Sequence, residues 1–248
     1  MANFWFNEAV KILLWYASAY LLGLWVVRRG VAVNYTRKIF LGTTFLFPQA
    51  LASVVPFKVS AATSAISWML FLGCVLTLCG PLRRRSKFLA TAFAAIDRPE
   101  DRPYTLRWLT TQLLVTFAVF LFMLHWLGQY GKAPLIYIVA LVMGVGDGLA
   151  EPVGYRFGRH KYRARALFTK RTYTRSLEGS ACVLLSAVCA ILLVQGHLSQ
   201  TQFWLAMSLI PPALTAAEAL SPHTWDGPLL YLTGGVATVA VLELSRVL

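Results

Sequence analysis

Charged residues are scarce in this sequence, and acidic residues are the scarcest. Asp, Glu, Lys and Arg make up 13% of the 248 residues, with 10 acids against 23 bases. A soluble globular domain normally has about 25% charged residues, so this chain cannot build the surface of one. Apolar residues make up 58% of the chain. They recur in runs of about 20, roughly the length that crosses a bilayer core.

Cysteine and histidine are also rare, with four of each. The cysteines all fall in apolar runs and have no metal-like spacing with histidine. They are Cys74, Cys79, Cys182 and Cys189. We interpret them as small residues that face lipid or the protein core, rather than as metal ligands.

The apolar runs predict an all-α fold, a polytopic bundle of about eight transmembrane helices, with seven as the other count. We expect one integral membrane domain over residues 1–248. The predicted spans are 9–27, 39–56, 61–80, 107–128, 133–151, 180–198, 203–220 and 228–245. The second and seventh are the least regular, because they contain Pro48 and Pro211-Pro212 and proline removes a helical hydrogen bond.

Lys and Arg gather in alternate loops between the predicted spans. The first, third and fifth loops hold four, seven and eight of them, the second and fourth hold one each, and the sixth holds none. Basic loops remain in the cytoplasm, so we expect the odd loops there and both termini on the opposite side. This distribution accounts for the net charge of +13 and excludes nucleic acid as the partner that the charge would otherwise suggest.

Five of the ten acids lie at the predicted cytoplasmic ends of spans five to eight. They are Asp147, Glu151, Glu178, Glu218 and Asp226. An ionisable residue at membrane depth is costly, so it is by default a candidate functional residue. Of the others, Glu8 and Glu243 lie near the chain ends, and three lie in a polar loop, where we expect water to solvate them: Asp97, Glu100 and Asp101.

A regular spacing of glycines and acids surrounds the first two of these residues. Positions 144, 147, 151, 154 and 158 are Gly, Asp, Glu, Gly and Gly, which would share one helix face. Its two carboxylates could share a Mg²⁺ ion, which takes one or two protein carboxylates and leaves its other positions to water and phosphate. Pro152 favours a break in the helix. The alternative is close helix packing by the glycines and a structural pair of acids.

A basic stretch follows directly. Its residues are Arg156, Arg159, His160, Lys161 and Lys170 to Arg175. Arg and Lys neutralise the charges of a nucleoside triphosphate. The alternative is that these bases only set the topology and contact anionic lipid. Ser176 or Ser180 could cap the next helix, where Glu178 would complement the N-terminus.

These residues resemble the polyprenol kinase family, which includes dolichol kinase, phytol kinase and the CTP-dependent diacylglycerol kinase, and more distantly the phosphatidate cytidylyltransferases. The resemblance covers roughly residues 140–230. It rests on three segments in order: 146–150 with 154–161, 175–181, and 218–221 with Asp226. The family usually has Lys where Arg175 stands, and often Asn where Gly227 stands.

The resemblance implies transfer of the γ-phosphate of CTP, or another nucleoside triphosphate, to an isoprenoid alcohol such as phytol, farnesol, geranylgeraniol or dolichol. Residues 140–230 would form a catalytic half at the cytoplasmic face. Mg²⁺ would be held by Asp147, Glu151 and Glu178, and Glu218 or Asp226 would accept the proton of the alcohol. The nucleotide would be bound by Gly148, Gly154, Gly158, Arg159, His160, Lys161, Arg175, Ser176, Gly179 and Ser180.

Two other functions fit the same residues. A cytidylyltransferase would use the same nucleotide but make a CDP-lipid from a lipid phosphate. A non-enzymatic membrane transporter would use its buried acids to gate ions. Transporters of this kind often contain paired repeats with broken helices, and the sequence contains no internal repeat of this kind.

Overall fold

The computed structural model describes residues 2–58, 60–165, 172–223 and 225–248. Within these ranges, five helices are long and apolar enough to cross a membrane. They are α1 (Ala2–Arg29), α6 (Thr105–Gln129), the continuous helix Ala133–Phe157, α10 (Gln200–Leu220) and α11 (Asp226–Val247). The fold is therefore an all-α bundle and indicates an integral membrane protein, as the apolar runs predict.

The predicted count of about eight spans is not confirmed. Helix α9 (Leu177–Leu193) and most of α3 (Ala61–Thr77) are apolar but shorter than the other five. Helix α2 (Val33–Val54) is long, yet it is not among the five found in the described chain. Arg37 and Lys38 near its start, and its several hydroxyl residues, make it the most polar of the long helices. The seventh predicted span, in contrast, is one of the five despite its two prolines.

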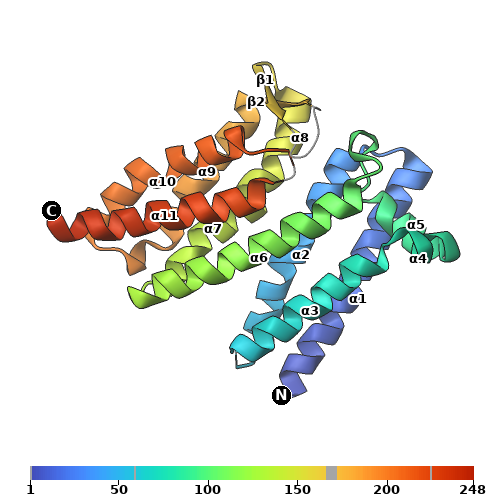
Figure 1. Cartoon of the computed structure of the whole chain (residues 1–248), viewed down its shortest axis with the longest axis horizontal. Coiled ribbons are helices and arrows are strands. Elements are labelled where there is room, and N and C mark those ends of the chain that lie inside the picture. The colour runs from blue at the N-terminus through green and yellow to red at the C-terminus, as the bar shows by residue number, and fades with distance from the viewer. Residues whose placement is uncertain (1, 59, 166–171, 224) are drawn as a thin grey trace. The chain divides into compact units, whose positions relative to one another are not determined.

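The chain forms two compact units, Met1–Thr110 and Thr111–Leu248, and each is described by itself. In unit 1, α1 packs against α2, α3 and α5 (Lys87–Ala94), as Figure 1 labels them. The short helix α4 (Gly80–Arg85) precedes α5, and η1 (Pro99–Asp101) follows it. Residues 87–93, which carry one base, Lys87, are helical in α5.

Helices α1 and α5 approach each other at Gly23. A Cβ atom added to Gly23 would lie 1.8 Å from the carbonyl oxygen of Thr91 in α5. A side chain of any size is therefore excluded unless the two backbones separate. Aromatic rings fill the same unit elsewhere, with Trp15 packed edge-on against Phe40 at a centroid distance of 5.3 Å.

Unit 2 is arranged around α9. Helix α9 packs against α7 (Ile136–Leu141), η3 (Val142–Asp147), α8 (Gly148–Phe157) and α10, while α11 packs against α10 and α7. Short η2 (Ala133–Leu135) and η4 (Gln195–His197) lie at helix ends. Val183, Ala187 and Ile191 of α9 are completely buried in this core. The predicted catalytic half, residues 140–230, lies wholly within this unit.

The helix that carries Asp147 contains a π-helical turn. Residues Val142–Asp147 form η3, and α8 continues from it through Pro152 to Phe157 without the break that the proline predicts. A π turn bonds residue i to i+5 and shifts the positions that follow it around the helix. The predicted residues therefore do not share one environment: a Cβ at Gly154 or Gly158 would meet neighbouring residues, whereas one at Gly144 would meet nothing within 4 Å.

The basic stretch that follows α8 forms a β-hairpin, which the sequence analysis does not predict. Strand β1 (Lys161–Arg165) pairs antiparallel with β2 (Thr172–Ser176), with Tyr162 opposite Arg175. Figure 1 shows the hairpin at the end of α8 and next to the start of α9. Side chains alternate between the two faces of a strand. Accordingly, Lys161, Arg163 and Arg165 are exposed while Tyr162 and Ala164 turn inward.

We expect Gly23→Ala to destabilise the protein by about 1–3 kcal/mol, the usual cost of overpacking, because its new Cβ would meet a backbone carbonyl. Thermal unfolding of purified protein in detergent measures this loss. Gly73→Ala, where a Cβ would meet nothing within 4 Å, is the matched control and should unfold no earlier than wild type. Equal midpoints for the two variants would contradict the close approach of α1 and α5.

Candidate active site at the hairpin end of unit 2

Glu218 is the most deeply buried of the five candidate acids, with 5% of its surface exposed. It lies two residues before the end of α10, so its carboxylate is near the end of an apolar helix. Desolvating a charge here is unfavourable unless other groups compensate for the lost water. The residues around Glu218 supply that compensation.

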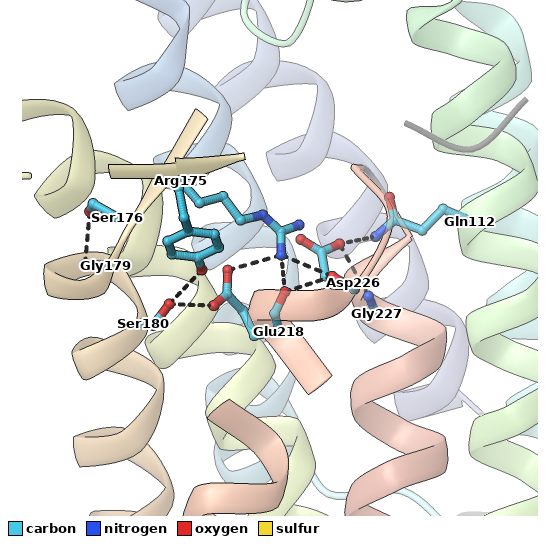
Figure 2. Close-up of polar contacts among 10 residues, drawn as sticks. Gln112, Arg175, Ser176, Gly179, Ser180, Glu218, Asp226 and Gly227 are labelled. Atoms are coloured by element: carbon cyan, nitrogen blue, oxygen red, sulfur yellow. Dashed lines mark hydrogen bonds and ion pairs between the residues drawn. The ribbon is translucent and has the colours of Figure 1, made fainter. Parts of the chain in front are cut away.

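Arg175 of β2 reaches Glu218 from the inward face of the hairpin, as Figure 2 shows. Its guanidinium nitrogen Nη1 lies 3.3 Å from Glu218 Oε1. The same nitrogen donates to the backbone carbonyl of Glu218 and, at 3.1 Å, to the hydroxyl of Ser221. Arg175 was predicted to bind phosphate. In this structure its charge is already paired with a carboxylate.

A second chain of hydrogen bonds reaches Glu218 from the other side. Ser180 donates to Glu218 Oε2 at 2.9 Å, and its hydroxyl lies 2.8 Å from that of Tyr162. A serine hydroxyl has only one hydrogen, so Tyr162 must be the donor to Ser180. Burial raises the pKa of Tyr162, which keeps this hydrogen in place at neutral pH.

Tyr162 was not among the predicted site residues. A signal for it was present, because Tyr and Ala alternate with bases over residues 161–165 in a period of two. That alternation predicts a strand whose inward face carries Tyr162.

Asp226 opens α11 and is held by a residue that sequence analysis missed. Gln112 of α6 donates its side-chain amide to Asp226 Oδ1 at 3.1 Å, and the backbone N–H of Gly227 donates to the same oxygen. A Cβ at residue 227 would lie 3.2 Å from the Gln112 amide nitrogen. Gln112 therefore supplies, from α6, a side-chain amide that the glycine at position 227 cannot provide. No local pattern could reveal a partner 114 positions away.

Two further acids influence Glu218 electrostatically. The charges of Asp147 and Asp226 both act on the Glu218 carboxylate, as does that of Arg175. The protein therefore brings three acids and one base to one end of unit 2, from the η3–α8 helix, α10, α11 and the hairpin. Asp147 and Asp226 are both partly exposed, unlike Glu218.

Oxygen donors of this type suit a hard cation such as Mg²⁺. Within the described part of the chain, however, no three His, Cys, Asp or Glu side chains are grouped closely enough to hold a metal ion by themselves. The predicted set of Asp147, Glu151 and Glu178 is thus not assembled as one cluster here. A Mg²⁺ ion that arrives with nucleotide phosphates needs only one or two carboxylates, which Asp147 and Asp226 can offer.

Glu178 serves a different part of the site. Its carboxylate accepts hydrogen bonds from the backbone N–H groups of Arg159 and His160, at 3.1 and 3.2 Å, and lies 2.9 Å from His160 Nδ1. It thereby fixes the end of α8 to the first turn of α9. Ser176 caps that turn by accepting from the N–H of Gly179 at 3.1 Å, as the sequence suggests.

Three predicted nucleotide-binding glycines pack helices together instead of lining open space. Cβ atoms at Gly154 and Gly158 would lie 2.8 Å from the Ser176 hydroxyl, and one at Gly179 would lie 2.6 Å from the Ala150 carbonyl. These contacts correspond to the packing alternative. Gly148 differs, because a Cβ there would meet nothing within 4 Å.

The remaining predicted residues lie at the edge of the site. Arg159, His160 and Lys161 are exposed, and Glu151 is partly buried in the first turn of α8. Lys170 and Arg171 lie outside the described residues. Together with Arg163 and Arg165, the exposed bases give the outer face of the hairpin a positive charge.

Comparison of the chain with protein-family models, with curated proteins and with solved structures found no match. The resemblance to the polyprenol kinases therefore remains a prediction from the three segments.

We expect Arg175→Met to destabilise the protein by about 3–5 kcal/mol, because removing one partner of a buried pair leaves an uncompensated charge. Thermal unfolding in detergent again measures the effect. Arg246→Met is the matched control, since the Arg246–Glu243 pair is largely exposed and exposed pairs contribute about 0–1 kcal/mol. Similar losses for both variants would contradict the pairing of Arg175 with a buried Glu218.

Proposed function

We propose that the protein is a lipid kinase that transfers the γ-phosphate of CTP, or of another nucleoside triphosphate, to the hydroxyl of an isoprenoid alcohol. The observation that carries the proposal is the convergence of Asp147, Glu218, Asp226 and Arg175 at one end of unit 2. The three segments that resemble the polyprenol kinases supply all four of these residues.

The position of the acids along their helices suits a lipid substrate. Glu218 lies near the end of α10, Asp226 is the first residue of α11, and Asp147 lies where η3 meets α8. Ends of apolar helices lie near the boundary between membrane and water. A lipid hydroxyl is found at this depth, and a water-soluble nucleotide can reach it.

The hairpin suits the nucleotide. Lys161, Arg163 and Arg165 are exposed on one face of β1, and Arg159 and His160 precede them. These side chains can contact a triphosphate, whose negative charge Arg and Lys neutralise. Arg175 lies on the inward face and is paired with Glu218. Its charge would act on the phosphate from beside the acids, and not as that of an unpaired cation.

The acids take separate roles in the proposed reaction. The alcohol oxygen forms a bond to the γ-phosphorus, the bond between that phosphorus and its bridging oxygen breaks, and CDP leaves. Asp226 accepts the proton of the alcohol, because it is less buried than Glu218 and is oriented by Gln112. Glu218, which is paired with Arg175 and Ser180, holds the site together. Mg²⁺, held by Asp147 and the phosphates, would neutralise the charge that develops on the phosphate oxygens.

Phosphate transfer from γ-labelled CTP, ATP, GTP or UTP to a panel of isoprenoid alcohols and diacylglycerol tests this proposal. The assay uses purified protein in detergent with Mg²⁺. We expect labelled alcohol phosphate with wild type, and a loss of at least about 100-fold with Asp147→Asn or Asp226→Asn, a typical effect of removing a general base or an essential charge. Chelation of Mg²⁺ should abolish transfer.

Glu243→Gln is the control for the carboxylate variants, because Glu243 lies near the far end of α11 and pairs with exposed Arg246. It should retain wild-type activity. A second assay offers lipid phosphates with α-labelled CTP, and a CDP-lipid with pyrophosphate as the products would assign a cytidylyltransferase instead. Failure to modify any lipid in either assay, with folded protein, would reject both enzymes.

Gln112 gives a second, more selective test. We expect Gln112→Leu to lower turnover about fivefold with little change in the KM for nucleotide, because one hydrogen bond of about 1 kcal/mol to Asp226 is lost. Gln129→Leu, at the exposed end of the same helix, should leave turnover unchanged. Unchanged turnover in Gln112→Leu would contradict the role of Asp226 as proton acceptor.

A further inference from the structure

Unit 1 contains a cavity of about 340 Å³ between α1, α2 and α3. This volume falls within the range of about 300–1,000 Å³ that is typical of small-molecule sites. Most of its wall is apolar and aromatic, formed by Trp15, Phe47, Trp68, Phe71 and neighbouring aliphatic side chains. The residues belong to unit 1 alone, so this cavity is separate from the candidate active site.

One end of the cavity carries a buried ion pair. The side chain of Glu8 is 5% exposed, and its Oε1 atom accepts from Lys11 at 2.8 Å and from Ser67 at 2.7 Å. Both donors use the same oxygen. Among the described residues no donor reaches Oε2, although a carboxylate oxygen has room for about two hydrogen bonds. Lys11 already balances the charge, so a ligand at this end needs to be neutral.

The rest of the wall offers hydrogen-bond acceptors and one unpaired donor, the buried indole N–H of Trp15, which has no partner among the described residues. Pro48 has no N–H, so the carbonyl of Thr44, four residues earlier in α2, lacks its helical partner. The hydroxyls of Thr43 and Thr44 both donate to the Phe40 carbonyl at 2.8 Å. The hydroxyl of Ser18 donates to the carbonyl of Trp15 at 3.0 Å. A hydroxyl group both donates and accepts, so a ligand that carries one matches this wall.

The charged end of the cavity lies near the start of α1, and Trp15 and Cys74 line the cavity further along. Helices α1 and α3 run parallel, because Glu8 contacts Ser67 and, farther along, Tyr16 contacts Thr77 at 2.8 Å. Glu8 lies about 9 Å from the start of α1, and Trp15 lies about 10 Å further along the helix, at 1.5 Å per residue. A lipid places its polar head and its apolar chain in this same order.

We propose that this cavity binds a single-chain amphiphile with a hydroxyl head group, taken up from the bilayer. The hydroxyl donates to Glu8 Oε2, and the chain lies against Trp15, Phe47 and Phe71. This proposal does not depend on the kinase activity, because it concerns a binding site and none of the residues assigned to catalysis.

A pair of photoreactive probes tests it: a straight-chain fatty alcohol that carries a diazirine and an alkyne, and its methyl ether. Full-length protein in lipid nanodiscs is irradiated with each probe, and labelled peptides are identified by mass spectrometry. We expect the alcohol to label α1 and α3 several-fold more than the ether, which has no donor. Equal labelling by both probes, or alcohol labelling spread evenly over all apolar helices, would overturn the proposal.

Two variants test separately the hydrogen bond to Glu8 and the volume of the cavity. Glu8→Gln should reduce labelling by the alcohol several-fold, whereas Glu243→Gln, which removes a carboxylate that also pairs with a base three residues away, should not. Thr44→Phe adds a ring to the cavity wall without touching the ion pair, and should reduce labelling by both probes. If folded Glu8→Gln and Thr44→Phe proteins both label like wild type, the cavity is not the site.

Discussion

The buried carboxylate of Glu218 is the constraint on which the arrangement of unit 2 depends. An unpaired charge at this point of an apolar helix would be strongly unfavourable. Arg175 pairs with it from the hairpin, and Ser180 donates to it from the start of α9. These partners come from β2 and α9. The ion pair and hydrogen bond of one side chain of α10 therefore link three elements. Tyr162 extends the same network to the opposite strand.

Other contacts at the hairpin end of unit 2 hold the hairpin where Arg175 can pair with Glu218. Gly154 and Gly158 allow α8 to approach Ser176, where β2 ends and α9 begins. The N–H of His223, between α10 and α11, donates to the carbonyl of Arg165 at 2.9 Å. The hairpin is therefore held from two sides, and its two faces differ: the inner face carries the paired Arg175, and the outer face carries exposed bases. This separation leaves positive charge available beside three acids, which supports a site for a phosphorylated ligand.

The sequence predicts the fold class but less of the detail. Runs of about 20 apolar residues suffice for a helical membrane bundle, whereas the number of spans depends on segments such as α2 and α9, which are close to the limits of polarity and length. The hairpin is visible in the alternation of residues 161–165 once that period is considered. The π turn has no local signal. The sequence also selects Glu218, Asp226 and Arg175, but not Gln112, whose contact with Asp226 exists only in three dimensions.

The most direct test is an experimental structure of the protein in lipid with Mg²⁺ and a CTP analogue that cannot be hydrolysed. The account predicts a triphosphate between the exposed bases of β1 and the carboxylates of Asp147 and Asp226, with Arg175 still paired to Glu218. A nucleotide bound elsewhere, or a Glu218 side chain turned away from Arg175 toward lipid, would contradict it.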